Sequence, residues 1–303
     1  MTDWGVLLPT FDPLRRGEPF AVAQAARLAE QAGYVSVWAG DHLKCPAPVL
    51  DAPTCLAVAA TATQNVQIGL SVMLLGLRPL AWAAKQLATL QHLSDNRLRL
   101  GVGVGGEFPQ EYEAAEVPHG RRGARLDDAL TLLPEFLTPG NEHSLEPPAP
   151  MPPVLVGGRS DRAVERAARF GDAWLPMWIS PETLAQRGER LAELASQHRR
   201  PAPSLSLLVL AHVDDDRGRA RAQADAHLRG QYGMALDRVE RWTALGSAAA
   251  VAEFLEPYIA IGVTEILLLP LGSHPLEQIE LLADATSRIR SPSRRVLSPG
   301  EMT

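Results

Sequence analysis

The sequence predicts an α/β protein with the fold of a (β/α)8 TIM barrel. Short apolar segments alternate along the chain with longer segments whose apolar residues recur at helical spacing. Eight such strand–helix units within 303 residues fit one barrel. The short segments are apolar throughout, as expected for parallel strands that are buried on both faces. A doubly wound open sheet is the competing architecture.

The predicted strands are runs of apolar residues that end at glycine, proline or polar residues. In the fourth run, Leu98, Leu100, Val102 and Val104 alternate with period two. The eight strands are predicted at residues 4–9, 35–39, 66–73, 98–104, 154–156, 173–176, 205–213 and 265–269.

Helices are predicted between these strands. The first lies between Pro19, which fits the first turn of a helix, and Gly33, which fits its end. The others are predicted at residues 53–63, 79–93, 121–137, 160–170, 182–197 and 275–290, with further helices filling residues 217–261. The proline-rich segment 138–153 is expected to be a connection, because a strand follows it at once.

Composition limits the class of protein and its location. We expect one barrel domain over residues 1–290 and a mobile C-terminal tail over residues 291–303. The net charge of −6 gives no reason to expect nucleic-acid binding, and no apolar run reaches the roughly 20 residues that span a membrane. The start of the chain has no signal-peptide pattern. With only Cys45 and Cys55 present, a disulfide framework is not expected, which suggests the reducing cytoplasm.

Residues that could carry chemistry follow several predicted strands. In a TIM barrel the carboxyl ends of the strands meet at one mouth, where active sites lie. We therefore expect one site that contains Asp41, His42, Ser71, Val72, Gly103, Gly105, Gly106, Glu107, Gly157, Gly158 and Arg159. This mixture suits a flat, partly anionic ligand, and its acidic and imidazole groups do not have the spacing of a zinc site.

The glycines after the fourth strand have three interpretations. Gly101, Gly103 and Gly106 match G-x-G-x-x-G, but a Rossmann motif should follow the first strand of a dinucleotide-binding unit. The glycines could form only a tight corner of the barrel. We favour a third interpretation, in which they form a floor beneath a cofactor ring, so that a side chain at Gly105 should prevent cofactor binding.

The other candidate residues also have structural alternatives. His42 could exchange protons with a substrate near neutral pH, or it could make only a structural hydrogen bond. Glu107 could be catalytic, or it could be solvated or bonded to its own turn. Gly157 and Gly158 could simply end the fifth strand, or they could expose amides to an anion at a helix start beside Arg159.

At these residues the chain resembles the luciferase-like (bacterial luciferase) superfamily of flavin- or deazaflavin-dependent oxidoreductases. No single motif is decisive, but the order and spacing of several motifs are similar over nearly the whole chain. The matching segments include Ser36-Val-Trp-Ala-Gly-Asp-His-Leu, Ile68-Gly-Leu-Ser-Val-Met, Asn96-Arg-Leu-Arg-Leu-Gly-Val-Gly-Val-Gly-Gly-Glu, Val156-Gly-Gly-Arg-Ser and Gly171-Asp-Ala-Trp.

The resemblance implies a two-electron cofactor at the barrel mouth. In members that use the deazaflavin coenzyme F420, a bulge with a cis peptide lies behind the ring, at the position of Ser71 and Val72. The Asp41–His42 pair matches residues on the cofactor and substrate side, with the histidine in the catalytic pocket. Glu107 matches less securely, because Gly105 and Gly106 precede it where many relatives differ. The resemblance also allows a homodimer.

These observations lead to a predicted function. We expect an enzyme that transfers hydride between F420 and a small organic substrate, with His42 and Glu107 as the catalytic residues. One alternative is an FMN-dependent monooxygenase, in which a reduced flavin activates oxygen. Another is a cofactor-binding protein that has lost catalysis on the same fold.

Overall fold

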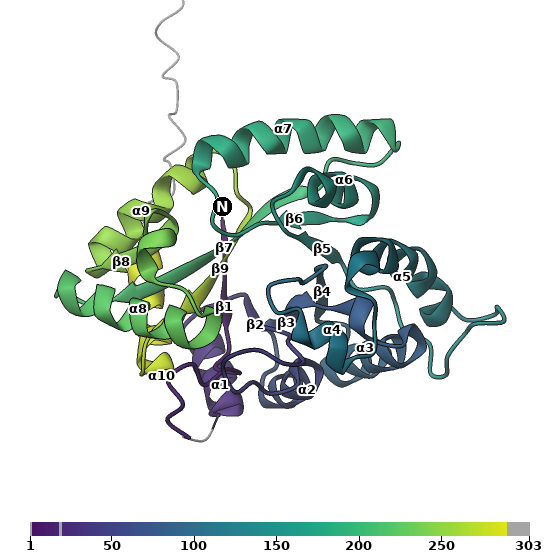
Figure 1. Cartoon of the computed structure of the whole chain (residues 1–303), viewed down its shortest axis with the longest axis horizontal. Coiled ribbons are helices and arrows are strands. Elements are labelled where there is room, and N and C mark those ends of the chain that lie inside the picture. Colours follow the sequence, from purple (N-terminus) through teal and green to yellow (C-terminus); the bar gives the residue numbers. More distant parts are fainter. Residues whose placement is uncertain (1, 18–19, 290–303) are drawn as a thin grey trace, which may run out of the picture.

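A closed barrel of parallel strands forms the centre of the molecule (Figure 1). The computed structural model describes residues 2–17 and 20–289. The strands are β1 (Asp3–Leu7), β2 (Ser36–Ala39), β3 (Gln67–Met73), β4 (Leu98–Val102), β5 (Val154–Gly157), β6 (Ala173–Leu175), β7 (Ser204–Val213), β8 (Thr243–Gly246) and β9 (Glu265–Pro270). Strands β1 to β6 pair in sequence order, β1 also pairs with β9, and β9 pairs with β7.

The barrel closes between β6 and β7. Strand β6 pairs only with the amino end of β7, through Ala173 with Ser204 and Trp174 with Leu205. Farther along, β8 pairs with the carboxyl end of β7 on the side opposite β9. The predicted (β/α)8 barrel is therefore confirmed for β1 to β7 and β9, and β8 is an additional strand at its edge.

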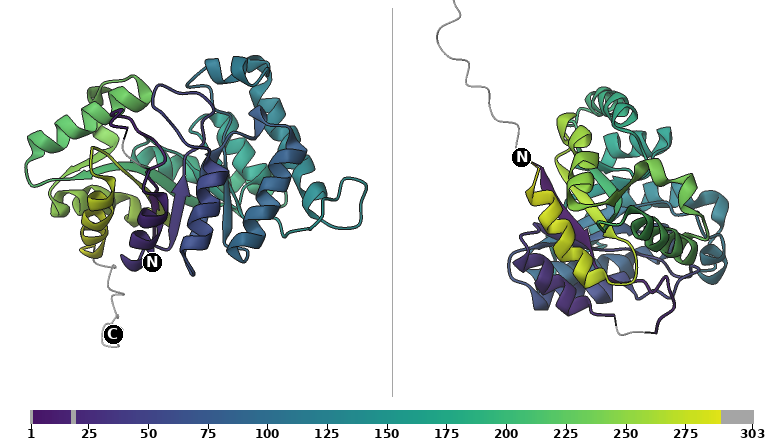
Figure 2. Two further views of the ribbon diagram at one scale, coloured as in Figure 1. Left: turned by 90° about the horizontal axis from the view of Figure 1, so that it is seen from below. Right: turned by 90° about the vertical axis from the view of Figure 1, so that its left-hand side faces the viewer.

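Ten α-helices in the described residues surround the barrel (Figures 1 and 2). They are α1 (Val22–Gln31), α2 (Ala52–Ala62), α3 (Leu80–Ser94), α4 (Gln110–Ala114), α5 (Arg122–Leu137), α6 (Asp161–Phe170), α7 (Pro181–Gln197), α8 (Arg217–Tyr232), α9 (Ala248–Ala260) and α10 (Pro275–Ser287). Side chains cap several of them; the hydroxyl of Ser160, for example, accepts from the backbone N–H of Ala163. Helix α10 contacts both α9 and α1, so the ring of helices also closes.

A polar network occupies the barrel interior at its amino end. Glu265 accepts hydrogen bonds from Arg99 at 2.6 Å and from the hydroxyl of Ser36 at 2.9 Å. The Trp38 indole donates to the same hydroxyl at 2.8 Å. A Cβ atom at Gly69 would lie 2.2 Å from the Trp38 ring, so glycine is needed there. Burial raises the pKa of Glu265, although Arg99 and Ser36 partly offset the effect. This end therefore serves packing and pairing, which leaves the opposite end for a site.

The structure differs from the sequence prediction at β8, at α4 and at the carboxyl ends of two strands. Strand β1 ends at Leu7 rather than Pro9. Residues 217–261 are not entirely helical, because β8 lies between α8 and α9. Its four residues precede the alanine-rich start of α9, so the local pattern appears helical, and pairing with β7 decides the outcome. Strand β4 ends at Val102 rather than Val104, and α4 was not predicted. The tail predicted for residues 291–303 lies outside the described residues.

The connection 138–153 contains no helix or strand, as predicted. No helix in residues 2–17 or 20–289 combines the length and apolar character that a membrane span requires.

Candidate functional site

A cavity of about 330 Å³ lies at the carboxyl ends of the strands. All the predicted site residues line this mouth cavity except Gly106, whose missing side chain would point toward Arg122. Apolar residues from β1, β6, β7 and the loops complete the wall, among them Leu7, Met177 and Leu208. The structure thus brings together residues from eight separate segments of the chain, as expected for a barrel mouth.

The end of β3 forms a bulge against β4. The strand register shifts between Leu70 and Met73, and the peptide bond between Ser71 and Val72 is cis. Both features were predicted at this position. The hydroxyl of Ser71 is buried and has no hydrogen-bond partner within the described residues. Ser71 itself lines the mouth cavity, which makes this hydroxyl a candidate hydrogen-bonding group for a ligand there.

Glycines on β4 and β5 make room for the side chain of Val72. A Cβ atom at Gly103 would lie 2.4 Å from a methyl carbon of Val72, and one at Gly157 would lie 3.0 Å from the other. The space beside both glycines is therefore filled by Val72, which itself lines the cavity. The apolar wall at this place consists of the valine side chain and the neighbouring backbone.

The turn after β4 depends on positive backbone angles. Gly105 has φ of 60° and Gly106 has φ of 116°. The Tyr112 hydroxyl donates to the carbonyl of Val104 and holds the turn against α4. A side chain at Gly105 would strain the backbone and would lie 3.2 Å from Leu74. A loss of cofactor binding in a Gly105 variant could therefore come from a distorted turn as well as from a blocked cavity. Gly103 offers a cleaner test of the cavity.

His42 is held by a carboxylate that was not predicted. Its Nδ1 lies 3.0 Å from Oε1 of Glu111, a fully buried residue on α4. The same oxygen accepts the backbone N–H of Leu43 at 2.8 Å, so the carboxylate acts as the acceptor. Nδ1 therefore carries the proton, and Nε2 is the ring nitrogen left for a ligand. The other oxygen of Glu111 is buried without a partner in the described residues.

Two aromatic rings fix the position of the His42 imidazole. Phe11 and Phe108 contact it edge to face, with ring centroids at 5.9 and 5.0 Å. Together with Glu111 they restrict its rotation at the cavity wall. Glu107, the other predicted catalytic residue, lies on the exposed rim of the same cavity.

Asp41 is paired with an arginine beside the cavity. Its buried carboxylate accepts two hydrogen bonds from Arg78, at 2.7 and 2.8 Å, and one from the backbone N–H of Leu74 at 2.9 Å. Leu74 follows the bulged end of β3. The carboxylate therefore joins the ends of β2 and β3 and supports the positions of His42 and Ser71.

The opposite side of the cavity combines glycine, arginine and tryptophan. Gly158 has φ of 104°, and its carbonyl accepts the indole N–H of Trp174 at 2.7 Å. Arg159 is exposed at the start of α6 and donates to the carbonyl of Trp178 at 3.0 Å. The indole nitrogen of Trp178 is buried without a partner in the described part of the chain, and its ring contacts Tyr232 edge to face at 5.5 Å.

These features fit a flat heterocyclic cofactor with an anionic tail. Val72 and the glycine backbone supply a surface for a ring, and the unpartnered Ser71 hydroxyl and Trp178 N–H can bond to its polar edge. The amino end of α6 and the charge of Arg159 favour an anion nearby. The sequence identified His42, Ser71 and Arg159 but missed Glu111, whose only local signal is a proline, Pro109, before a short helix.

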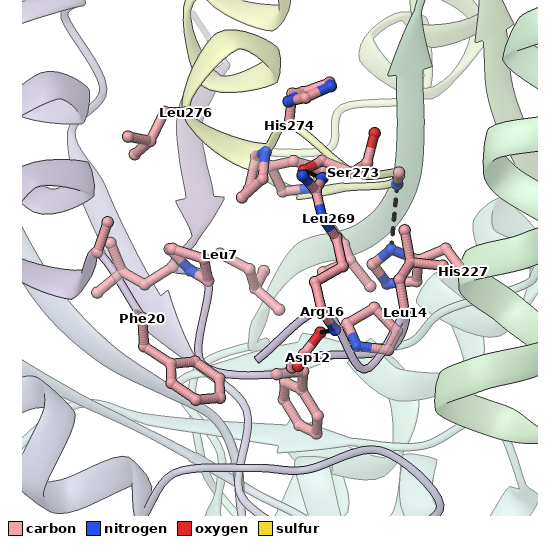
Figure 3. A pocket seen from close by; sticks show the side chains of 18 of the residues that line it. Leu7, Asp12, Leu14, Arg16, Phe20, His227, Leu269, Ser273, His274 and Leu276 are labelled. Atoms are coloured by element: carbon pink, nitrogen blue, oxygen red, sulfur yellow. Dashed lines mark hydrogen bonds between the residues drawn. The ribbon is translucent and has the colours of Figure 1, made fainter. Parts of the chain in front are cut away.

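A second cavity of about 370 Å³ lies beyond Leu7 and Phe11 (Figure 3). These two residues and Gln231 on α8 line both cavities. The backbone N–H of Gly272 donates to Nδ1 of His227 at 3.1 Å, so the proton of the neutral ring is on Nε2, which donates to the side-chain oxygen of Gln231 at 2.9 Å. Burial lowers the pKa of His227 from 6.5 to about 4.

The lowered pKa of His227 makes the stability of the folded protein depend on pH. The unfolded chain takes up the His227 proton near pH 6.5, and the folded protein takes it up only near pH 4. Between these two pH values the chain takes up a proton at His227 when it unfolds, so the free energy of unfolding falls as the pH decreases from 6.5 to about 4. We expect the His227 contribution to the free energy of unfolding to fall by about 3 kcal/mol.

Denaturant titrations across this pH range measure the effect. His227→Gln should show a correspondingly weaker pH dependence than the unaltered protein, and His198→Gln on the exposed end of α7 should not. Equal pH slopes for the unaltered protein and His227→Gln would contradict a buried neutral imidazole.

Known proteins with similar sequence include enzymes that use F420. An F420-dependent glucose-6-phosphate dehydrogenase from Beutenbergia cavernae is 29% identical over 301 residues, which cover 89% of this chain and 77% of that protein. A putative coenzyme F420-dependent oxidoreductase from Mycobacterium tuberculosis is 29% identical over 203 residues, covering 56% of this chain and 55% of that protein.

Solved structures share the fold at low sequence identity. An F420-dependent secondary alcohol dehydrogenase in complex with an F420–acetone adduct has a TM-score of 0.82 at 17% identity, over 96% of this chain and 99% of that chain. The monooxygenase RslO1 from Streptomyces bottropensis has a TM-score of 0.77 at 21% identity, over 94% of this chain and 98% of that chain. These likenesses confirm the barrel of the luciferase-like type.

The family model for luciferase-like monooxygenases matches residues 3–257. This match covers most of the chain and includes every predicted site residue. The resemblance noted in the sequence is thus confirmed, and the protein belongs to the luciferase-like monooxygenase family.

Proposed function

We propose that the protein is an oxidoreductase that transfers hydride between coenzyme F420 and a small organic substrate. The observation that carries this proposal is the lining of the mouth cavity, which combines His42 with Ser71 and Trp178, whose side-chain O–H and N–H groups have no partner in the described residues. The F420-dependent relative that covers 89% of this chain supports the choice of cofactor.

Each wall of the cavity has a role in holding the cofactor. Val72 would lie beside the ring, and the Ser71 hydroxyl and Trp178 N–H would supply hydrogen bonds to its polar groups. Gly158, Arg159 and the amino end of α6 would bind the anionic tail. Asp41 acts through Arg78 and Leu74 to position the bulge rather than by contact of its carboxylate with the ring.

The protein's own part in the reaction is to position the substrate and move its proton. F420, when bound, supplies the hydride chemistry. In the oxidation of an alcohol, the carbon loses a hydride, the hydroxyl proton passes to Nε2 of His42, and a carbonyl group forms. Glu111 accepts the Nδ1 proton and so leaves Nε2 as the ring nitrogen that takes the substrate proton. Glu107 is proposed as a second proton-exchanging group at the exposed rim.

Parallel titrations with F420 and FMN test the proposal. We expect F420 to bind about tenfold or more tightly than FMN. Addition of secondary alcohols should then reduce the bound deazaflavin, which is measured by loss of its visible absorbance. Tighter binding of FMN with consumption of oxygen would support a flavin monooxygenase, and cofactor binding without turnover on any substrate would support a non-catalytic protein.

A further inference from the structure

The second cavity has a buried apolar wall, and the charged side chains of its lining are exposed or half-buried (Figure 3). Its buried wall includes Leu7, Leu8, Leu269 and Pro270. Arg16, His274 and Glu277 in the lining are exposed to solvent, and Asp12 is half-buried. The Asp12 carboxylate accepts the backbone N–H groups of Arg16 and Gly17. An apolar molecule could therefore be enclosed without burying a charge of the protein.

Two polar side chains, His227 and Gln231, lie in the buried part of this lining. The Gly272 N–H fixes the tautomer of His227, and His227 in turn occupies the side-chain oxygen of Gln231. The orientation of the Gln231 amide is thereby determined, with its NH2 group as the free end. Burial raises the pKa of Tyr232, and a hydrogen bond with Gln231 partly offsets that rise.

The contact with His227 uses the oxygen of the Gln231 amide and leaves its NH2 group as a donor. Because Gln231 lines both cavities, this group lies beside the place where a ligand at their junction would bind. An NH2 group donates and does not accept, so it selects an acceptor oxygen. The neutral His227 supplies no charge for an anion. The cation of the lining, Arg16, is exposed and donates to the carbonyl of Ser273, so a carboxylate bound beside Gln231 would lose its hydration without a cation in the buried part of the cavity.

We propose that this second cavity is the substrate chamber, and that it binds a neutral, largely apolar ketone or aldehyde whose oxygen accepts a hydrogen bond from Gln231. The assignment rests on the proposed function, since it places the carbonyl group beside the mouth cavity that would hold F420. Gln231 acts as a positioning residue, and Leu7 and Phe11 form the apolar boundary between chamber and cofactor.

Binding of a rigid probe series to the unaltered protein tests the ligand class. Adamantanone, adamantane and adamantane carboxylate share one apolar body and differ in the polar group. Ligand-detected NMR titration should show the ketone binding roughly three- to tenfold more tightly than the hydrocarbon, with the carboxylate weakest. Equal affinity of ketone and hydrocarbon, or preference for the carboxylate, would overturn the assignment.

Matched variants locate the donor. Gln231→Glu keeps the oxygen that accepts from His227 and loses the NH2 group, so it should abolish the preference for the ketone over the hydrocarbon. Gln223→Glu, on the same helix, keeps the acceptor for the Ser273 N–H and should leave that preference unchanged. Gln231→Met serves as a second variant without a donor if the carboxylate impairs folding. A retained preference in both Gln231 variants would overturn the role of Gln231.

Variants that fill one cavity separate this inference from the proposed function. Leu276→Trp, in the first turn of α10, should remove binding of adamantanone and leave F420 binding intact. Retained adamantanone binding in this variant would overturn the chamber assignment. If neither F420 nor FMN binds the unaltered protein while adamantanone binds as described, the proposed function and the role of the cavity as a substrate chamber are overturned, and the binding site for a neutral ketone at Gln231 is supported.

Discussion

Replacement of His42 by alanine is expected to lower turnover by about 10²–10⁴-fold, because the reaction loses the group that takes or returns the substrate proton. The fold and cofactor binding should persist. The imidazole is held from one side by Glu111 and by two aromatic rings, and none of these depends on it to pack the barrel. Rates with saturating cofactor, cofactor affinity and thermal melting on the same preparation measure the three properties.

A second histidine provides the control. His92 on α3 bonds to the carbonyl of Pro148 at an exposed site, so His92→Ala should leave turnover nearly unchanged. A structural role for His42 would instead lower the melting temperature first and reduce activity only in proportion to unfolded protein. Near-normal turnover of a well-folded His42→Ala would remove His42 from the mechanism.

A valine at Gly103 is expected to weaken cofactor binding by roughly 10- to 100-fold. The new Cβ would lie 2.4 Å from a methyl carbon of Val72, so Val72 must move, and the mouth cavity is the open space beside it. The ring site would then be narrowed by a displaced valine as well as by the new side chain. Fluorescence titration with F420 measures the loss.

Two further variants distinguish this effect from general damage. Gly120→Val introduces the same side chain where no atom lies within 4 Å, and it should retain normal affinity. Combining Gly103→Val with Val72→Ala removes the clashing methyl carbons and should recover part of the binding. If Gly103→Val folds and binds F420 normally, the glycine-lined wall is not the ring site.

The barrel could be predicted from the sequence because its strand–helix periodicity is local. The strand ends then place His42, Ser71 and Gly157 at one mouth, since parallel strands end on the same side. The resemblance to a known family supplied the cis peptide at Ser71, which no local pattern reveals. These predictions depend on order along the chain, and the sequence carries that information directly.

The remaining features depend on contacts between distant segments. Glu111 lies on a five-residue helix without a long periodic pattern, and only the folded chain brings it to His42, 69 positions away. The space beside Gly103 is filled by Val72 because of a register shift between β3 and β4. The orientation of the Gln231 amide on α8 depends, through His227, on the backbone N–H of Gly272 in the loop between β9 and α10. None of these contacts leaves a signal at one position of the sequence.

Strand β8 has a consequence for the behaviour of the chain in a crowded solution. From Leu210 to Val213, β7 extends beyond its pairing with β6, and without β8 its unpaired backbone N–H and C=O groups would be open to a strand from another molecule. Strand β8 pairs with that edge and is itself only four residues long, which makes it a poor template for further strand addition. A segment that lines neither cavity thus protects the protein against edge-to-edge aggregation.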